Sequence, residues 1–220
     1  MSAEHAEFWS TVARRYDAVV DLQIGPTTRA MVRERLAKED ALGDVVEFGC
    51  GTGFYTETLA AKARRLVATD LSPGMVAVAR ERVAAADVMF QVEDCQRTSF
   101  ADCTFDTAFV SLVLHFTEPE VALAEMRRIL RPGGRLIVAN LDPLALRPLD
   151  RLRALVRILF HGATGYRTKP PQGFGRHVLG EQQLLDLLRA SDFAVVRRER
   201  IQDTSCSSNV PIEYVVARKM

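Results

Sequence analysis

The chain has 220 residues, of which 48% are hydrophobic and 26% are charged, and its formal net charge is +1. This composition indicates an ordinary soluble globular chain with one domain and a sizeable core. The near-neutral charge gives no general argument for binding nucleic acid or an anionic membrane. The chain has no run of 18 apolar residues, so no transmembrane helix is predicted.

Strand-like and helix-like segments alternate along the chain. The predicted strands cover residues 45–48, 65–69, 88–92, 106–114, 135–140, 194–201 and 212–218, and helices are predicted near 54–63, 73–86, 118–130 and 180–190. Alternation of this kind favours a parallel sheet covered by helices. The last two strands have only a short connection, which predicts an antiparallel pair. The fold class is therefore α/β: seven strands, mostly parallel, with one antiparallel strand and helices on both faces.

The end of the first strand is the most informative segment. Val45-Val-Glu-Phe48 runs into a turn with glycine at every second position, Gly49-Cys-Gly-Thr-Gly53. Glycines allow a sharp turn and the close approach of a ligand, and the N-terminus of the helix that follows attracts anionic or polar groups. The second strand ends in Asp70, seventeen residues after Gly53. An acid at that point is well placed to bind a ribose diol.

The spacing of these glycines distinguishes the turn from the dinucleotide-binding fingerprint. That fingerprint is Gly-x-Gly-x-x-Gly, and here the third glycine comes one residue earlier. Glu47-x-Gly-x-Gly-x-Gly53 instead resembles the first motif of class I S-adenosylmethionine-dependent methyltransferases. The string Arg131-Pro-Gly-Gly134, followed by a strand, is also typical of this superfamily, in which its role is structural.

The N-terminal segment carries a further resemblance. Phe8-Trp9-x3-Ala13-Arg-Arg-Tyr16-Asp17 is similar to the entry helix of small-molecule methyltransferases related to the ubiquinone/menaquinone C-methyltransferases. In that group the helix folds over the cofactor as a lid, so Tyr16 is predicted to contact the methionyl part. The resemblance covers roughly residues 5 to 140 and implies a Rossmann-like fold.

The resemblance implies that S-adenosylmethionine is the cofactor and S-adenosylhomocysteine the product. Asp70 would bind the ribose hydroxyls, Leu71 and Met75 would flank the adenine, and Asp94 would accept a hydrogen bond from the adenine amino group. Ser111, at the end of the fourth strand, would line the methyl-transfer site. Two alternatives stay open: Met75 as a core residue and Asp94 as an ordinary turn aspartate. The predicted cofactor-binding set is Tyr16, Glu47, Gly49, Cys50, Gly51, Thr52, Gly53, Asp70, Leu71, Met75, Asp94, Cys95, Ser111 and Leu112.

The candidate catalytic residue is His115, which follows the fourth strand in Leu-Val-Leu-His-Phe. A histidine there could act as a general base toward the acceptor. The alternative, a histidine that hydrogen-bonds the backbone and shapes the loop, stays open. No metal site is predicted, because the four cysteines are scattered and lack Cys-x-x-Cys spacing. Their scatter indicates a reducing cytoplasm.

Residues 141–177 form a connection too long for a simple loop, and such insertions are often functional. The segment holds seven Lys and Arg residues against two Asp. Residues 147–160 predict a basic amphipathic helix, and a glycine- and proline-rich stretch follows that could act as a lid. Three interpretations of the segment stay open: a lid, a peripheral membrane contact through 147–160, or a face packed on the sheet or on a second subunit. The candidate acceptor-contacting residues are His161, Tyr166, Arg167, Phe174 and His177.

These observations predict one domain over residues 1–220. Entry helices occupy 1–40, the cofactor-binding core 41–140, the acceptor-covering insertion 141–177, and a helix with the antiparallel strand pair 178–220. The predicted function is methyl transfer from S-adenosylmethionine to a small-molecule acceptor (quinone-like, phenolic or amine) by in-line displacement. The protein is expected to be a cytoplasmic monomer or homodimer that does not bind nucleic acid. The alternatives are a non-catalytic S-adenosylmethionine-binding subunit and, less favoured, a NAD-dependent oxidoreductase.

Overall fold

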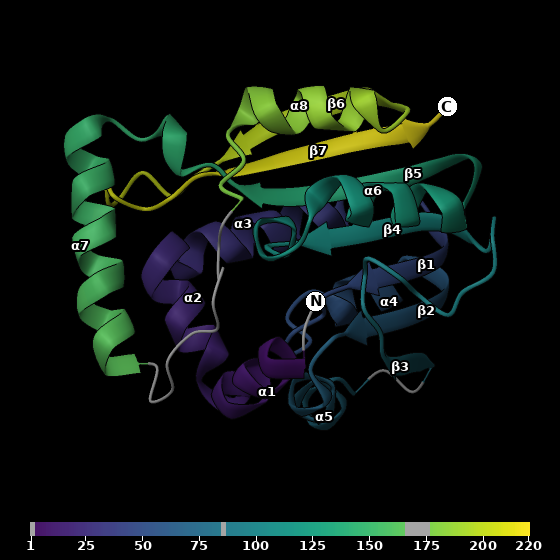
Figure 1. Ribbon diagram of the computed structural model, residues 1–220, viewed down its shortest axis with the longest axis horizontal. Helices are drawn as coiled ribbons and strands as arrows, with labels where there is room; N and C mark the ends of the chain where they lie inside the picture. Colours follow the sequence, from purple (N-terminus) through teal and green to yellow (C-terminus); the bar gives the residue numbers. More distant parts are fainter. Residues whose placement is uncertain (1–2, 85–86, 166–176) are drawn as a thin grey trace.

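A seven-stranded sheet forms the centre of the computed structural model, which describes residues 3–84, 87–165 and 177–220, with only the backbone at Gln23 and 157–165 (Figure 1). The strands are β1 Gly43–Phe48, β2 Ala63–Asp70, β3 Val88–Val92, β4 Phe105–Ser111, β5 Leu130–Leu141, β6 Phe193–Ile201 and β7 Ile212–Lys219. Their order in the sheet is β3-β2-β1-β4-β5-β7-β6. Strand β7 is antiparallel to both of its neighbours and the other pairs are parallel. The predicted fold class is confirmed.

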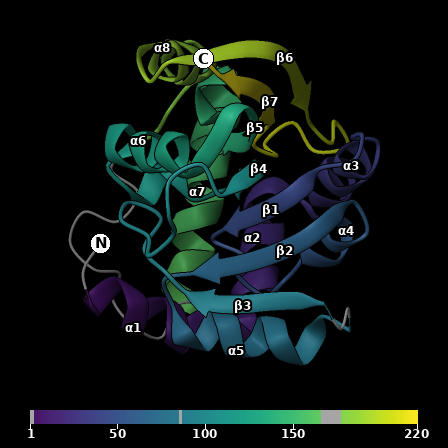
Figure 2. The ribbon, with the colours of Figure 1, turned by 90° about the vertical axis from the view of Figure 1, so that its right-hand side faces the viewer.

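Helices cover both faces of the sheet. They are α1 Ala3–Val12, α2 Tyr16–Ile24, α3 Pro26–Ala37, α4 Thr56–Ala60, α5 Pro73–Arg82, α6 Pro119–Ile129, α7 Pro148–Gly165 and α8 Glu181–Ala190, with short 3-10 turns η1 Ala13–Arg15, η2 Leu114–Phe116 and η3 Pro143–Ala145. Alternate side chains of β5 point to opposite faces. Leu136 and Val138 pack with α6 and α8, whereas Ile137 and Ala139 pack with α2, α3 and α4. Figure 2 shows α6 and α8 on one side of the sheet and α3 and α4 on the other.

Three predicted boundaries are wrong, each for a local reason. The helix expected near 54–63 is the shorter α4, because the turn continues through Tyr55 and β2 already begins at Ala63. The strand expected to reach residue 114 ends at Ser111, because Leu112 turns the chain with a φ of 57°. The helix expected to reach residue 86 ends at Arg82, where the next residue is already extended.

Two features at the edge of the sheet position the site. Helix α1 lies against the N-terminus of α5, where the Ser10 hydroxyl is 2.8 Å from the Ser72 hydroxyl and accepts a hydrogen bond from the Gly74 N–H at 3.2 Å. Helix α7 lies at one end of the molecule beside α2 (Figure 1). The covering of the cofactor by the N-terminal helices, which the entry-helix resemblance implies, stays a prediction.

Candidate functional site

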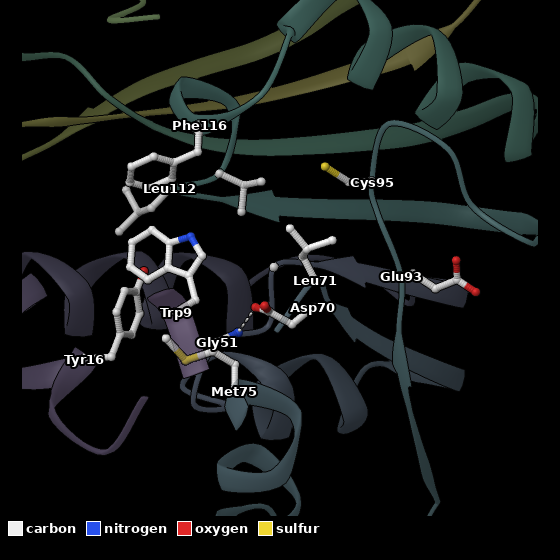
Figure 3. A pocket seen from close by; sticks show the side chains of 12 residues that line it. Trp9, Tyr16, Gly51, Asp70, Leu71, Met75, Glu93, Cys95, Leu112 and Phe116 are labelled. Carbon is white, nitrogen blue, oxygen red and sulfur yellow. Dashed lines mark hydrogen bonds between the residues drawn. The ribbon is translucent and has the colours of Figure 1, made fainter. Parts of the chain in front are cut away.

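A cavity opens at the carboxyl ends of β1, β2, β3 and β4 (Figure 3). In open α/β sheets, ligands bind beyond the carboxyl ends of the strands where the strand order reverses, which here is between β1 and β4. The cavity is lined by Trp9, Tyr16, Gly49, Gly51, Asp70, Leu71, Met75, Glu93, Cys95, Leu112, Val113 and Phe116.

Asp70 is the acidic group at the centre of this lining. One carboxylate oxygen accepts a hydrogen bond from the Gly51 N–H at 3.0 Å, and the other accepts from the Ser72 N–H at 2.9 Å. Burial raises the pKa of Asp70 to about 6, although these backbone N–H groups oppose the shift. A carboxylate oxygen can accept more than one hydrogen bond, so the Asp70 carboxylate suits a vicinal diol.

The glycine turn follows β1 and forms the floor of the cavity. Gly49 has a φ of 63°, and a Cβ on it would lie 2.1 Å from a methyl carbon of Val113. A Cβ on Gly51 would lie 3.3 Å from the Tyr16 ring. The turn therefore needs glycine for its left-handed backbone and because neighbouring side chains approach it closely.

An aromatic cluster forms the opposite wall. The Trp9 ring meets the Phe116 ring edge-on at a centroid separation of 5.0 Å and the Tyr16 ring at 5.7 Å. These residues come from α1, η2 and the start of α2, and Figure 3 shows them gathered on one side of the cavity. Tyr16 was in the predicted set, whereas Trp9, Glu93, Val113 and Phe116 were not. The Phe8-Trp9 motif was a usable signal for Trp9. Phe116, which lines the cavity, directly follows the predicted residue His115 in the chain.

The structure separates the predicted cofactor-binding residues into two groups. Tyr16, Gly49, Gly51, Asp70, Leu71, Met75, Cys95 and Leu112 line the cavity, whereas Glu47, Cys50, Thr52, Gly53, Asp94 and Ser111 do not. One carboxylate oxygen of Asp94 accepts from the Gln96 N–H at 3.0 Å, as in a turn, and Glu93 lines the cavity instead. A role for Asp94 in binding adenine stays a prediction.

His115 lies on η2, outside the cavity lining. Its ring Nδ1 is buried and has no hydrogen-bond partner among the described residues. Burial lowers the pKa of His115 to about 4, so the imidazole is neutral at pH 7 and binds a proton weakly. The His177 N–H donates to the His115 carbonyl at 3.5 Å. This geometry favours the loop-shaping interpretation, and general-base catalysis by His115 stays a prediction.

Of the predicted acceptor contacts, only His177 has a described side chain. Its Nε2 lies 3.6 Å from a carboxylate oxygen of Glu118. Tyr166, Arg167 and Phe174, with the side chain of His161, fall outside the described residues. Within the parts that the structure does describe, no three potential ligands from His, Cys, Asp and Glu group into a metal site, and no helix has the length and apolarity needed to cross a membrane.

Glu47 lies buried beneath the glycine turn and accepts a hydrogen bond from the Thr56 hydroxyl at 2.7 Å. Burial, with a smaller contribution from the Asp70 charge, raises its pKa from 4.5 to about 8. The folded chain therefore keeps a proton on Glu47 that the unfolded chain releases above about pH 4.5, and stability is lost as the pH rises toward 8.

Glu47→Gln, which cannot ionise, is expected to remove this loss. Relative to the variant, the unmodified chain should lose about 2 kcal/mol of unfolding free energy between pH 6 and pH 8. Urea unfolding at both pH values measures the difference, with the exposed Glu120→Gln as control. If the two variants show the same pH dependence, the buried proton on Glu47 is refuted.

The chain matches a known protein family. Residues 46–138 match a family described as a methyltransferase domain, and the match covers the glycine turn, Asp70 and the strands through β5. Residues 46–138 are thus similar to a methyltransferase domain. The site fits S-adenosylmethionine as the cofactor: Asp70 suits the ribose diol, and the apolar and aromatic walls suit the adenine.

The sequence is also similar to proteins that are named as methyltransferases. The chain is 37% identical to a demethylmenaquinone methyltransferase from Beutenbergia cavernae over 153 residues, which is 67% of this chain and 62% of that protein. It is 32% identical to a malonyl-[acyl-carrier protein] O-methyltransferase from Serratia marcescens over 147 residues, which is 66% of this chain and 55% of that protein. The matches thus span less than two thirds of the length of these relatives.

The fold of the methyltransferase domain is also found in solved structures. The N-methyltransferase NodS from Bradyrhizobium japonicum, in complex with S-adenosylhomocysteine, aligns with a TM-score of 0.65 at 22% identity. The alignment covers 89% of this chain and 87% of that one. At 22% identity, this likeness shows that the two proteins share a fold and nothing more.

Proposed function

We propose that this chain transfers a methyl group from S-adenosylmethionine to a small-molecule acceptor and releases S-adenosylhomocysteine. The observation that carries the proposal is the cavity itself. It joins Asp70 and the glycine turn on one side to the aromatic wall of Trp9, Tyr16 and Phe116 on the other. The position of the cavity, at the carboxyl ends of the central strands, and the family match both support it.

The residues of the cavity would act mainly by binding and positioning. S-adenosylmethionine supplies an electrophilic methyl group on a sulfonium. Asp70 accepts hydrogen bonds from the ribose hydroxyls, while Leu71 and Met75 contact the adenine. Leu112 and the aromatic wall exclude water and orient the acceptor in line with the bond that breaks. Positioning of this kind can remove about 7–11 kcal/mol of the barrier.

We further propose a quinone-like, phenolic or amine acceptor. The printed names of the relatives differ in acceptor, one acting on demethylmenaquinone and the other on malonyl-acyl-carrier protein, so the names alone do not select one. Acceptor contact through His161, Tyr166, Arg167, Phe174 and His177 stays part of the proposal, as do a monomeric or homodimeric state and a cytoplasmic location. Exposed Leu149, Leu152, Leu155 and Val156 on α7 support the interpretation of 147–160 as a contact surface.

Calorimetric titration with S-adenosylmethionine, S-adenosylhomocysteine and NADH tests the cofactor. Micromolar binding of the first two and none of NADH is expected, and binding of NADH alone would restore the oxidoreductase alternative. Transfer of a labelled methyl group to a panel of quinols, phenols and amines then tests the reaction. Tight cofactor binding without turnover on any acceptor would favour the non-catalytic subunit.

A further inference from the structure

One carboxylate joins the N-terminal helices to the glycine turn. An oxygen of Asp17, the second residue of α2, accepts hydrogen bonds from the Thr52 hydroxyl and from the Arg29 guanidinium, both at 2.8 Å. The other oxygen of Asp17 pairs with the Arg82 guanidinium at the end of α5. The same guanidinium donates to the Thr52 hydroxyl at 3.1 Å. Helices α2, α3 and α5 and the cofactor-binding turn therefore meet at Asp17.

The partners of Asp17 are themselves held in place. The Arg29 side chain is 3% exposed, bonds a carboxylate oxygen of Asp21 at 2.9 Å, and lies with its guanidinium carbon 3.8 Å from the centroid of the Phe54 ring. Burial opposes ionisation of Asp17, but the hydrogen bonds from Arg29, Thr52 and Arg82 outweigh it and keep the pKa of Asp17 below its ordinary value. The carboxylate is therefore charged throughout the neutral range, so the cluster remains intact there.

The position of Asp17 connects this cluster to the cavity. Tyr16 directly precedes it, and the Tyr16 ring packs against Gly51 and meets the Trp9 ring. Thr52 lies between the two glycines at 51 and 53. The Asp17–Thr52 bond thus fastens the aromatic wall to the floor of the cavity, between residues 35 positions apart in the chain.

We propose that Asp17 is a positioning residue: it latches the entry segment, residues 3–24, onto the glycine turn, and release of this latch controls how fast the nucleoside ligand dissociates. A ligand in the cavity lies between the turn and the wall that Trp9, Tyr16 and Phe116 form. When the latch opens, Trp9 and Tyr16 are free to move away from the turn and the ligand leaves. The proposal rests on the proposed binding of S-adenosylhomocysteine, which titration of the unmodified chain tests separately, and it holds or fails independently of any acceptor.

Dissociation of S-adenosylhomocysteine from Asp17→Asn tests the latch. Trp9 is the only tryptophan in the chain and lines the cavity, so its fluorescence reports the site in stopped-flow displacement by excess S-adenosylmethionine. Asp17→Asn is expected to raise the dissociation rate about tenfold, the scale of losing hydrogen bonds to a charged group. The matched control is Asp21→Asn, which also loses a bond to Arg29 but has no contact with the turn. It should change the rate by less than about twofold.

Unfolding midpoints of both variants separate a latch from a general loss of stability. The proposal is supported if the two variants unfold alike and only Asp17→Asn releases the ligand faster. It is overturned if Asp17→Asn leaves the rate unchanged, or if both variants change it equally. Should Asp17→Asn fail to fold, Thr52→Val replaces it, because it removes the hydroxyl that donates to Asp17 and accepts from Arg82. An unchanged dissociation rate in that variant would also refute the latch.

Discussion

Replacing Asp70 with alanine is expected to weaken S-adenosylmethionine binding by about 1–3 kcal/mol, or roughly 5- to 150-fold in Kd. The substitution removes the proposed acceptor of the ribose hydroxyls. It also leaves the Gly51 and Ser72 N–H groups without the acceptor that each now has, and an unpaired buried donor is costly. Calorimetric titration of the folded variant measures the loss.

The pH dependence of cofactor affinity provides an independent check that Asp70 binds the ribose. Its pKa is about 6, and the ionised form is the better acceptor for two hydroxyls, so affinity should fall as the pH drops below about 6. Asp70→Asn should bind more weakly at pH 7 and lose this pH dependence. Asp203→Ala, which removes a surface carboxylate with a similar bond from the Ser205 N–H, serves as control and should bind normally. Unchanged affinity in folded Asp70→Ala would contradict the placement of the ribose.

Gly49→Ala is expected to lower the unfolding free energy by about 2–5 kcal/mol and to abolish measurable cofactor binding. The left-handed backbone at Gly49 costs an L residue about 1–2 kcal/mol. Overlap of the new methyl with Val113, at 2.1 Å, adds about 1–3 kcal/mol. Because Val113 lines the cavity, its displacement also reshapes the binding site. Urea unfolding and calorimetric titration measure the two effects.

Gly133→Ala is a matched control for the backbone cost alone. Gly133 has a φ of 70°, close to that of Gly49, but a Cβ there would have nothing within 4 Å. This variant should therefore lose only about 1–2 kcal/mol and keep its cofactor affinity. Val113→Ala in the Gly49→Ala background should restore part of the lost stability by making room for the methyl group. Equal destabilisation by Gly49→Ala and Gly133→Ala would show that Val113 is not the obstacle.

Local chemistry explains why much of the site could be predicted from the chain. The positions of Gly49, Gly51 and Asp70 follow from where two apolar runs end, because parallel strands deliver their carboxyl ends to one edge of a sheet. Cys95 and Leu112 come from the next strand ends by the same logic. The position of a strand end does not predict which neighbouring side chain lines the cavity. The chain has two neighbouring acids after β3, and only the structure shows that Glu93 rather than Asp94 lines the cavity.

The sequence by itself determined the strand–helix alternation, the antiparallel end of the sheet, the glycine turn and the acid that faces it. These are consequences of hydrophobic periodicity, connection length and glycine backbone freedom, which act within a few residues. Only the tertiary structure decided that Trp9 and Phe116 form one wall, that His115 is buried with a low pKa, and that Asp17 bonds Thr52 and Arg82. Those contacts join residues far apart in the chain, so they depend on how the helices pack against the sheet, which no local pattern encodes.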